Sequence, residues 1–586
     1  MKKIFAFIQI VLITGGILLP CSCDDFLTKE PPGVAFGPNL EAEQGVESLL
    51  VGAYAMLRGH TDRRFGGAMA TDWVYGSGAS DDCYKGSEAG DQTNFNDVER
   101  YETLPTNLYM AHRWTDCYNG VSRCNQVLIF LKAAQSGDSP LTAERALQVE
   151  GEAKFLRAWF HFQANKVFKT IPYIKTPEEL GSILPEEVPN KDAGWDEIES
   201  DLQFAIDNLP ENSYNNEPGR ATKYAAMAVK AHAHMHQNEF DQAKPLLDKI
   251  LESGQYALTA NYFDNYDERT ENNTESIFEI QCSASAVNKT GLPMAGTVMH
   301  QTGGAAAVGW GFYQPSQCLV DAFQVDDEGL PVLDINARAT VKNDMGIGSD
   351  DEFTPTDQLL DLRLDWTVSR RGVDYLGWGI SPGRSWIRVQ ENGGPYMTKK
   401  YMHFQASQSS QYGNGFDNNR NYRMYRLAHV ILWRAECAIE EGDLERAREL
   451  VNQIRDRVKT STPVMGLCKT TKFSGSDPIV EWDKPAANYK TEPYPTGHDA
   501  FSSKEKAREA VRLEIRLEFA TEGQRFFDLR RWGIDVEVLN DYIRRDSEFR
   551  NFMKGAVYTA KKRYWPIPQS QLDIQPGVLT QDPDHL

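Results

Sequence analysis

The chain has 586 residues, of which 41% are hydrophobic and 25% are charged, and its formal net charge at pH 7 is −21. This is the composition of a globular protein that is long enough for more than one hydrophobic core. The excess of acidic side chains argues against a nucleic-acid partner and against broad adsorption to anionic lipid, because both need a basic surface.

The first residues have the pattern of a secretory signal. Lys2 and Lys3 precede an apolar run over 4–19, which is shorter than the roughly 20 residues that span a bilayer. A cysteine that follows the small Ser22 has the form of a bacterial lipoprotein cleavage site. We therefore expect a signal peptide over 1–22 and a lipid on Cys23, with plain secretion as the alternative.

The cysteines indicate neither a disulfide framework nor a zinc site. There are nine in this long chain, and none has CxxC spacing. Cys117 and Cys124 fall on one predicted helix and lie about 10 Å apart along its axis, which is too far for a bridge. No cofactor is expected.

Helical periodicity dominates two parts of the chain. It occurs over 39–58, 108–134, 142–169, 194–209, 222–253, 425–458 and 502–543. Between them, 259–420 is rich in Gly, Asn, Asp and aromatic residues, and 459–500 is a long loop region with five prolines. We predict a single domain over 23–586. Its helical scaffold lies at about 39–258 and 421–545, and the irregular region 259–420 packs on that scaffold.

Two helical stretches share a pattern of small residues. Ala231 and Ala243 are 12 residues apart across a turn, and so are Ala435 and Ala447. Small residues at this offset let two antiparallel helices approach closely, as in tetratricopeptide repeats. The fold class is therefore mainly α, with about four helix pairs of this type.

Five segments, taken together and in order, resemble the SusD/RagB family of outer-membrane nutrient-binding lipoproteins. They are CDDFL at 23–27, GEAKFLRAWF at 151–160, YRLA and WRAE within 425–436, RLEFATEGQRFFDLRRWG at 516–533 and WPIPQ at 565–569. They span almost the whole mature chain. The loop region 459–500 is longer than usual in the family, which could mean a subgroup with its own ligand or partner contacts.

The resemblance implies a function without catalysis. A protein of this family is held at the cell surface of the outer membrane by its N-terminal lipid. It captures oligosaccharide and delivers it to a SusC-like TonB-dependent transporter, which is its expected partner. Peptide uptake by the same family is the first alternative. A surface glycoside hydrolase and a pure scaffold are the others.

The segment 516–533 also has a reading of its own. Glu518, Glu522, Arg525, Asp528 and Arg531 recur at spacings of three and four on a predicted helix, so we expect them to form one mixed-charge stripe. A catalytic carboxylate pair is conceivable here, but we expect a structural ion-pair seam that locks two helices. Arg157 is likewise expected to reach another helix.

A sugar ring offers one face of C–H groups, which flat aromatic side chains match, while neighbouring polar groups bond the hydroxyls. Two loop segments fit this requirement, one at 71–78 and one at 309–315, and the family's ligand-binding loops come from roughly these regions. The expected ligand contacts are Trp73, Tyr75, Trp310, Tyr313, Asp72, Asn96 and Trp378. For each aromatic residue the alternative is a ring buried against the scaffold.

Other signals are weak. His232, His234 and His236 alternate along one predicted helix, which permits a metal site but offers no third ligand, so ordinary helix-surface histidines are expected. The chain has no HExxH, P-loop or GxSxG motif.

Overall fold

The structure is a computed structural model that describes residues 40–59, 67, 70–137, 140–282, 311–407 and 420–586. The predicted signal peptide, Cys23 and Trp310 lie outside these residues. None of the helices in the described segments combines the length and apolar character that crossing a bilayer requires.

The fold is mainly α, as predicted. Seventeen α-helices are described in these segments. The N-terminal half contains α4 (Glu43–Tyr54), α5 (Thr93–Glu99), α6 (Leu108–Gln135), α7 (Ala143–Phe168), α8 (Pro177–Leu180), α9 (Trp195–Asn208), α10 (Lys223–Gln237) and α11 (Phe240–Glu252). The rest contains α13 (Gln317–Ala322), α14 (Arg363–Thr367), α15 (Gln390–Gly393), α17 (Leu427–Glu441), α18 (Leu444–Thr460), α19 (Lys504–Glu518), α20 (Arg525–Arg531), α21 (Asp535–Phe549) and α22 (Gln569–Ile574).

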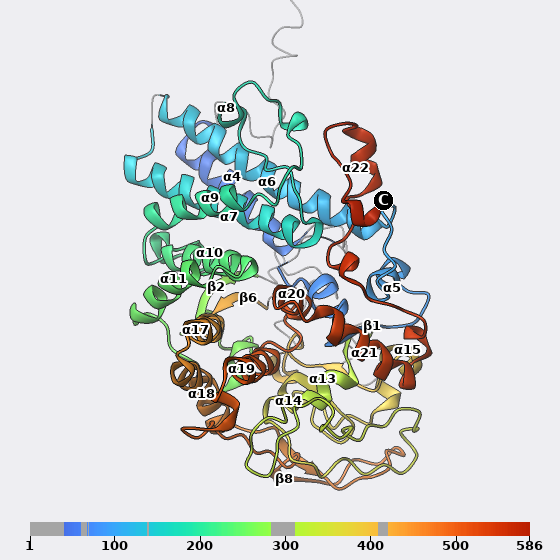
Figure 1. The fold of residues 1–586 in the computed structure, drawn as a ribbon. Coiled ribbons are helices and arrows are strands. Elements are labelled where there is room, and N and C mark those ends of the chain that lie inside the picture. Colours follow the sequence, from blue (N-terminus) through green and yellow to red (C-terminus); the bar gives the residue numbers. More distant parts are fainter. Residues whose placement is uncertain (1–39, 60–66, 68–69, 138–139, 283–310, 408–419) are drawn as a thin grey trace, which may run out of the picture.

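The longer helices form a continuous stack in which each packs against the next, from α6 and α7 through α9, α10 and α11 to α17, α18 and α19 (Figure 1). Small residues allow the close approach. A Cβ on Gly120 of α6 would lie 2.5 Å from the ring of Phe160 on α7. Ala231 and Ala243 are fully buried between α10 and α11. The helix pairs are therefore present, while their assignment as tetratricopeptide units stays a prediction.

The two turns predicted between paired helices each contain a left-handed residue. Asn238 ends α10 with φ 59°, and Gly442 ends α17 with φ 86°. The following helix starts at once, and in α18 the Asp443 side chain accepts a hydrogen bond from the Arg446 N–H. The predicted helix over 502–543 is likewise divided into α19, α20 and α21. The charged residues of 516–533 are therefore spread over two helices and a turn, and the expected single stripe is wrong.

The strands in the described part of the chain are short and make four two-stranded antiparallel pairs. The pairs are β1 (Cys83–Gly86) with β3 (Phe312–Pro315), β2 (Ser276–Ile280) with β6 (Tyr422–Arg426), β4 (Val368–Ser369) with β5 (Met397–Thr398), and β7 (Met465–Cys468) with β8 (Val480–Pro485). The β1–β3 and β2–β6 pairs join the irregular region to the two helical parts of the chain. The β4–β5 pair lies within the irregular region. The last is a hairpin inside the predicted loop 459–500.

The irregular region gathers below the helical stack in Figure 1, around α13 and α14. One hydrophobic core runs from Val46 to Leu579 and takes side chains from both helical parts. One smaller cluster joins the irregular region to α19, and another lies within the irregular region, where residues 262–266 pack against 375–402. Packing on the scaffold, as expected from the sequence, is what positions this region.

Candidate functional site

The predicted ligand loop at 71–78 lies in the core. It forms a single π-helical turn, η2 (Trp73–Gly78), that follows the left-handed residue Asp72. The Trp73 side chain is only 1% exposed. Its ring lies 5.0 Å from the Phe95 ring and 5.3 Å from the Tyr313 ring, centroid to centroid. Trp73 and Tyr313, which were both expected to face a sugar, therefore pack against each other.

The reason for this burial is a backbone contact with the segment around Gly523. A Cβ on Gly76 would lie 1.7 Å from the Gly523 carbonyl oxygen, and a Cβ on Gly523 would lie 1.9 Å from the Thr71 carbonyl oxygen. Gly523 also has φ +78°, which favours glycine. The glycines of 71–78 thus permit close packing of distant segments and do not mark an exposed loop.

The polar groups of the same residues are already bonded inside the protein. Asp72 forms an ion pair with Arg113 at 2.8 Å and a second one with Lys166. The Tyr75 hydroxyl donates to the Tyr109 carbonyl oxygen at 2.8 Å, and the Tyr313 hydroxyl donates to the Thr521 carbonyl oxygen at 2.6 Å. In this conformation Asp72, Tyr75 and Tyr313 offer no free group to a ligand.

The remaining predicted contacts do not join them. Asn96 is partly exposed on α5, and its Nδ2 donates to the Ala89 carbonyl oxygen at 3.0 Å. Trp378 is buried, and its Nε1 donates to the His403 carbonyl oxygen at 3.0 Å. The described residues therefore show no common open surface for the predicted set. Contact between Trp310 and a ligand stays a prediction.

The family-like segment 516–533 forms a buried ion-pair network, as expected. Glu518 lies at the end of α19 and pairs with Arg457 at 2.5 Å, Arg426 at 2.6 Å and Arg363 at 3.1 Å. All four side chains are buried. These residues lie on four elements, α14, β6, α18 and α19, so the network ties the irregular region and α18 to the core.

The electrostatics of this network exclude a general acid role for its carboxyl groups. Burial alone would raise the pKa of Glu518, but Arg457, Arg426 and Arg363 together hold it well below its usual range. The pKa of Glu522 is likewise lowered to about 2, because Arg426 and Lys400 outweigh the effect of burial. A carboxylate that stays ionised and has no access to solvent cannot deliver a proton to a substrate.

Two further ion pairs match the sequence-based interpretation. Arg157 pairs with Asp201 of α9 at 2.7 Å and with Glu179 of α8 at 2.7 Å, so it does reach other helices. Arg516 and Arg525 both hold Asp81, which follows the buried turn at 71–78. The charged family motif thus helps to fix the contact between residues 71–78 and the turn at 519–524, which we call the buried junction.

The histidines of α10 are not ordinary surface residues, so that expectation is wrong. The His232 ring stacks on Trp433 with centroids 4.7 Å apart, and its Nδ1 lies 3.0 Å from the Tyr425 hydroxyl. The His236 ring packs edge-on against Phe162. His234 is also buried and points to a different set of neighbours, Glu199 and Glu239.

One exposed aromatic residue was missed by the sequence analysis. Trp482 lies on β8, and its side chain is 57% exposed, more than any other tryptophan in the described residues. Its ring covers Gly466 on β7, where a Cβ would lie 2.8 Å from the ring. One ring face thus rests on the hairpin and the residue remains open to solvent. A glycine opposite a tryptophan on paired strands is the signal that could have identified it.

Two open cavities lie away from the buried junction. A groove of about 600 Å³ runs between α6, α7 and the 176–179 segment, with an apolar floor that includes Leu128, Leu131 and Leu147. A pocket of about 270 Å³ is lined by residues that include Tyr54, Arg58, Arg220 and Gln281. This second pocket lies where the described chain stops before 60–66 and before 283–310, the segment that contains Trp310.

The described residues define a mainly helical protein whose family-like motifs hold the fold together. Comparison with known proteins then identifies it. The family model described as the SusD family matches residues 274–585, which is more than half of the chain. A second model, described as starch-binding associating with outer membrane, matches residues 25–234. The chain belongs to the SusD family.

Similar proteins cover the chain along its whole length. A SusD-like protein of Formosa agariphila is 24% identical over 98% of both chains. Among solved structures, surface glycan-binding protein A from Bacteroides thetaiotaomicron in complex with laminarihexaose is 18% identical. Its TM-score is 0.65, and the match covers 92% of this chain and 99% of that one. A SusD superfamily protein from Bacteroides vulgatus has a TM-score of 0.64 at 21% identity, with 93% of this chain and 99% of that one covered. The fold predicted from the sequence is confirmed.

Proposed function

We propose that this protein is a lipid-anchored protein of the outer-membrane surface that binds an oligosaccharide or polysaccharide and delivers it to a TonB-dependent transporter. The observation that carries the proposal is membership of the SusD family. The description of the second family model, which joins starch binding to the outer membrane, supports it further. So does the similar solved structure, which is in complex with laminarihexaose.

Binding without catalysis fits the chemistry of the described residues. Glu518 and Glu522, two of the three acidic residues of the motif at 516–533, are buried in ion pairs and kept ionised. Neither can act as the protonated carboxylic acid that a glycoside hydrolase needs. The protein would then hold its ligand and release it unchanged.

We propose that ring faces outside the buried junction make the sugar contacts. Trp310 is the first candidate, since it lies two residues before the start of β3, and packing between Tyr313 and Trp73 would hold that strand in place. Trp482 is the second candidate, because its ring is open to solvent on the β7–β8 hairpin. Two such platforms, less the cost of ordering a flexible glycan, give an expected Kd of about 10 μM to 1 mM.

Calorimetric titration of the purified protein against a panel of polysaccharides and peptides tests the binding. Trp310→Ala and Trp482→Ala are each expected to weaken glycan binding about tenfold. Phe549→Ala is the matched control, because Phe549 is an exposed aromatic residue on α21. Unchanged affinity in both tryptophan variants would discard these platforms. Binding of peptides alone would replace the ligand class, and release of reducing sugar would make the protein a hydrolase.

Anchoring and delivery need separate tests. Labelled palmitate is expected on the wild-type protein and absent from Cys23→Ser. A TonB-dependent transporter is expected to co-purify with the wild-type protein from detergent-solubilised outer membranes. A protein that carries no lipid and remains in the periplasm would contradict the surface role.

A further inference from the structure

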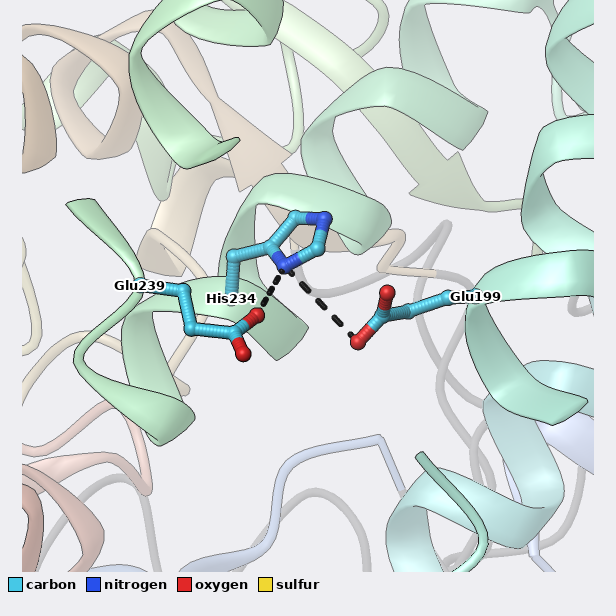
Figure 2. Close-up of side chains that lie close together, drawn as sticks. All are labelled: Glu199, His234 and Glu239. Atoms are coloured by element: carbon cyan, nitrogen blue, oxygen red, sulfur yellow. Dashed lines mark hydrogen bonds and ion pairs between the residues drawn. The ribbon is translucent and has the colours of Figure 1, made fainter. Parts of the chain in front are cut away.

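Three side chains from three consecutive helices of the stack meet around one nitrogen atom. His234 Nδ1, near the end of α10, lies 2.7 Å from Glu239 Oε2 and 3.7 Å from Glu199 Oε1. Glu239 directly precedes α11, and Glu199 lies on α9. Figure 2 shows both carboxylates pointing toward the same edge of the imidazole ring.

The local structure holds this arrangement in place. The left-handed turn at Asn238 folds the chain back, and the Glu239 N–H donates to the His234 carbonyl oxygen at 2.9 Å. Gln237 donates from Nε2 to Glu199 Oε1 at 2.8 Å, which orients that carboxylate toward the histidine. The three ligand atoms lie within 4.8 Å of one another without any change in the backbone.

These separations suit a bound cation. Zinc binds imidazole nitrogen and carboxylate oxygen at about 2.0–2.2 Å, so in a tetrahedral site the ligand atoms are about 3.3–3.6 Å apart. The observed 2.7 Å and 3.7 Å lie on either side of that range. Small side-chain rotations of Glu239 and Glu199 would therefore form three bonds to one ion.

The charge of the cluster points the same way. Elsewhere in the described residues, carboxylates such as Glu518 and Glu436 lie against arginines. No Lys or Arg side chain in the described part of the chain forms an ion pair with Glu199 or Glu239. The two carboxylates carry a charge of −2, which one divalent cation neutralises.

The site is open on one side. The Glu239 side chain is 44% exposed and the Glu199 side chain 23%, while His234 is 5% exposed. An ion can enter from solvent, and water can fill the remaining coordination position. The buried histidine would anchor the ion and the two carboxylates would close over it.

We propose that His234, Glu199 and Glu239 form a structural site for a divalent transition-metal ion of the zinc type. One imidazole nitrogen among the ligands favours zinc over calcium or magnesium, which take oxygen ligands. The ion would join α9, α10 and α11 at the centre of the helical stack. The proposal does not depend on which nutrient the protein binds.

The test uses the purified protein without a histidine tag, after removal of metal with a chelator. Zinc titration followed by calorimetry is expected to show one saturable equivalent, and cobalt is expected to give visible absorption typical of a tetrahedral site. Zinc is also expected to raise the melting temperature. A wild-type protein with no stoichiometric binding would overturn the proposal.

Two isosteric variants locate the site. Glu239→Gln and Glu199→Gln are each expected to weaken zinc affinity about tenfold or more and to remove the cobalt absorption. The matched controls are Glu197→Gln on α9 and Glu252→Gln on α11, which should bind as the wild type does. Equal affinity in all four variants would mean that His234 and Glu239 form only a hydrogen bond and that the ion binds elsewhere.

Discussion

Two regions of this protein place a tryptophan beside glycine residues outside the α-helices, and the structure treats them in opposite ways. Trp73 lies in a glycine-rich turn and is 1% exposed, whereas Trp482 lies on a hairpin and is 57% exposed. Near Trp73 the glycines bring a distant segment into backbone contact. At Trp482, Gly466 only leaves room for the ring, and both residues belong to the same hairpin. A glycine-rich setting thus indicates close approach, and the approaching segment decides whether a neighbouring ring is buried.

The largest loss of stability should come from removing the buried ring of Trp73. Trp73→Ala removes a ring packed among Phe95, Phe312 and Tyr313. We expect the free energy of unfolding to fall by about 4 kcal/mol, because the residual cavity cannot collapse fully. Urea denaturation measures it, and Trp73→Phe should lose less. A loss below about 1 kcal/mol would show that the ring is not part of the core.

The charged part of the same junction should come next. Glu518→Gln keeps the side-chain shape but leaves Arg426, Arg457 and Arg363 without their shared anion. We expect a loss of about 3 kcal/mol, since breaking a buried pair leaves uncompensated charge. Glu505→Gln, at the exposed start of the same helix, is the control and should change stability by less than about 0.5 kcal/mol.

Low pH should destabilise the buried junction without affecting the β7–β8 hairpin. Burial and the nearby Arg426 lower the pKa of His429, which stacks on Phe519, to about 3. The folded state therefore binds fewer protons than the unfolded state between about pH 3 and pH 6.5. The resulting stability is complete above pH 6.5 and is lost as the pH falls, by up to about 1.4 kcal/mol per pH unit.

The comparison of wild type with His429→Gln isolates this effect. The variant should show a shallower loss of stability between pH 6.5 and pH 4.5, measured by urea denaturation at each pH. The β7–β8 hairpin contains no histidine and should contribute nothing to the difference. Parallel curves for the two proteins would contradict a neutral, buried His429.

The smallest effect on stability should come from the exposed position. Trp482→Ala removes a ring that mainly faces solvent, so the free energy of unfolding should change by less than about 0.5 kcal/mol. The same variant is expected to bind glycan more weakly. A large loss of stability would mean that the hairpin depends on this ring, and the contrast with Trp73 would disappear.

The sequence predicted the helices well because their periodicity and caps are local. The bounds of α6 and α7 differ from the predicted ranges by one residue at most. Prediction from the sequence failed where contacts between distant segments determine where a helix ends. The turn at 519–524 breaks a predicted helix because Gly523 must meet the 71–78 segment. No local pattern reveals that meeting.

The candidate site was harder for the same reason. Exposure of Trp73, Tyr75 and Tyr313 depends on partners more than 20 residues away, so residue type and loop composition could not determine it. The charged seam was easier, because buried arginines and carboxylates in a helical motif usually pair. Glu199, the third member of the His234 cluster, became visible only when α9 was placed beside α10.

The contact between Gly76 and Gly523 joins backbone near the start of the described residues to backbone near their end, with no side chain between them. During synthesis, the turn at 71–78 therefore cannot reach its final packing until more than 440 further residues have followed it. A chain that crosses a membrane by threading must stay unfolded until it has emerged. In this protein the core closes only after the motif at 516–533 has been made, as a chain exported in that way would require.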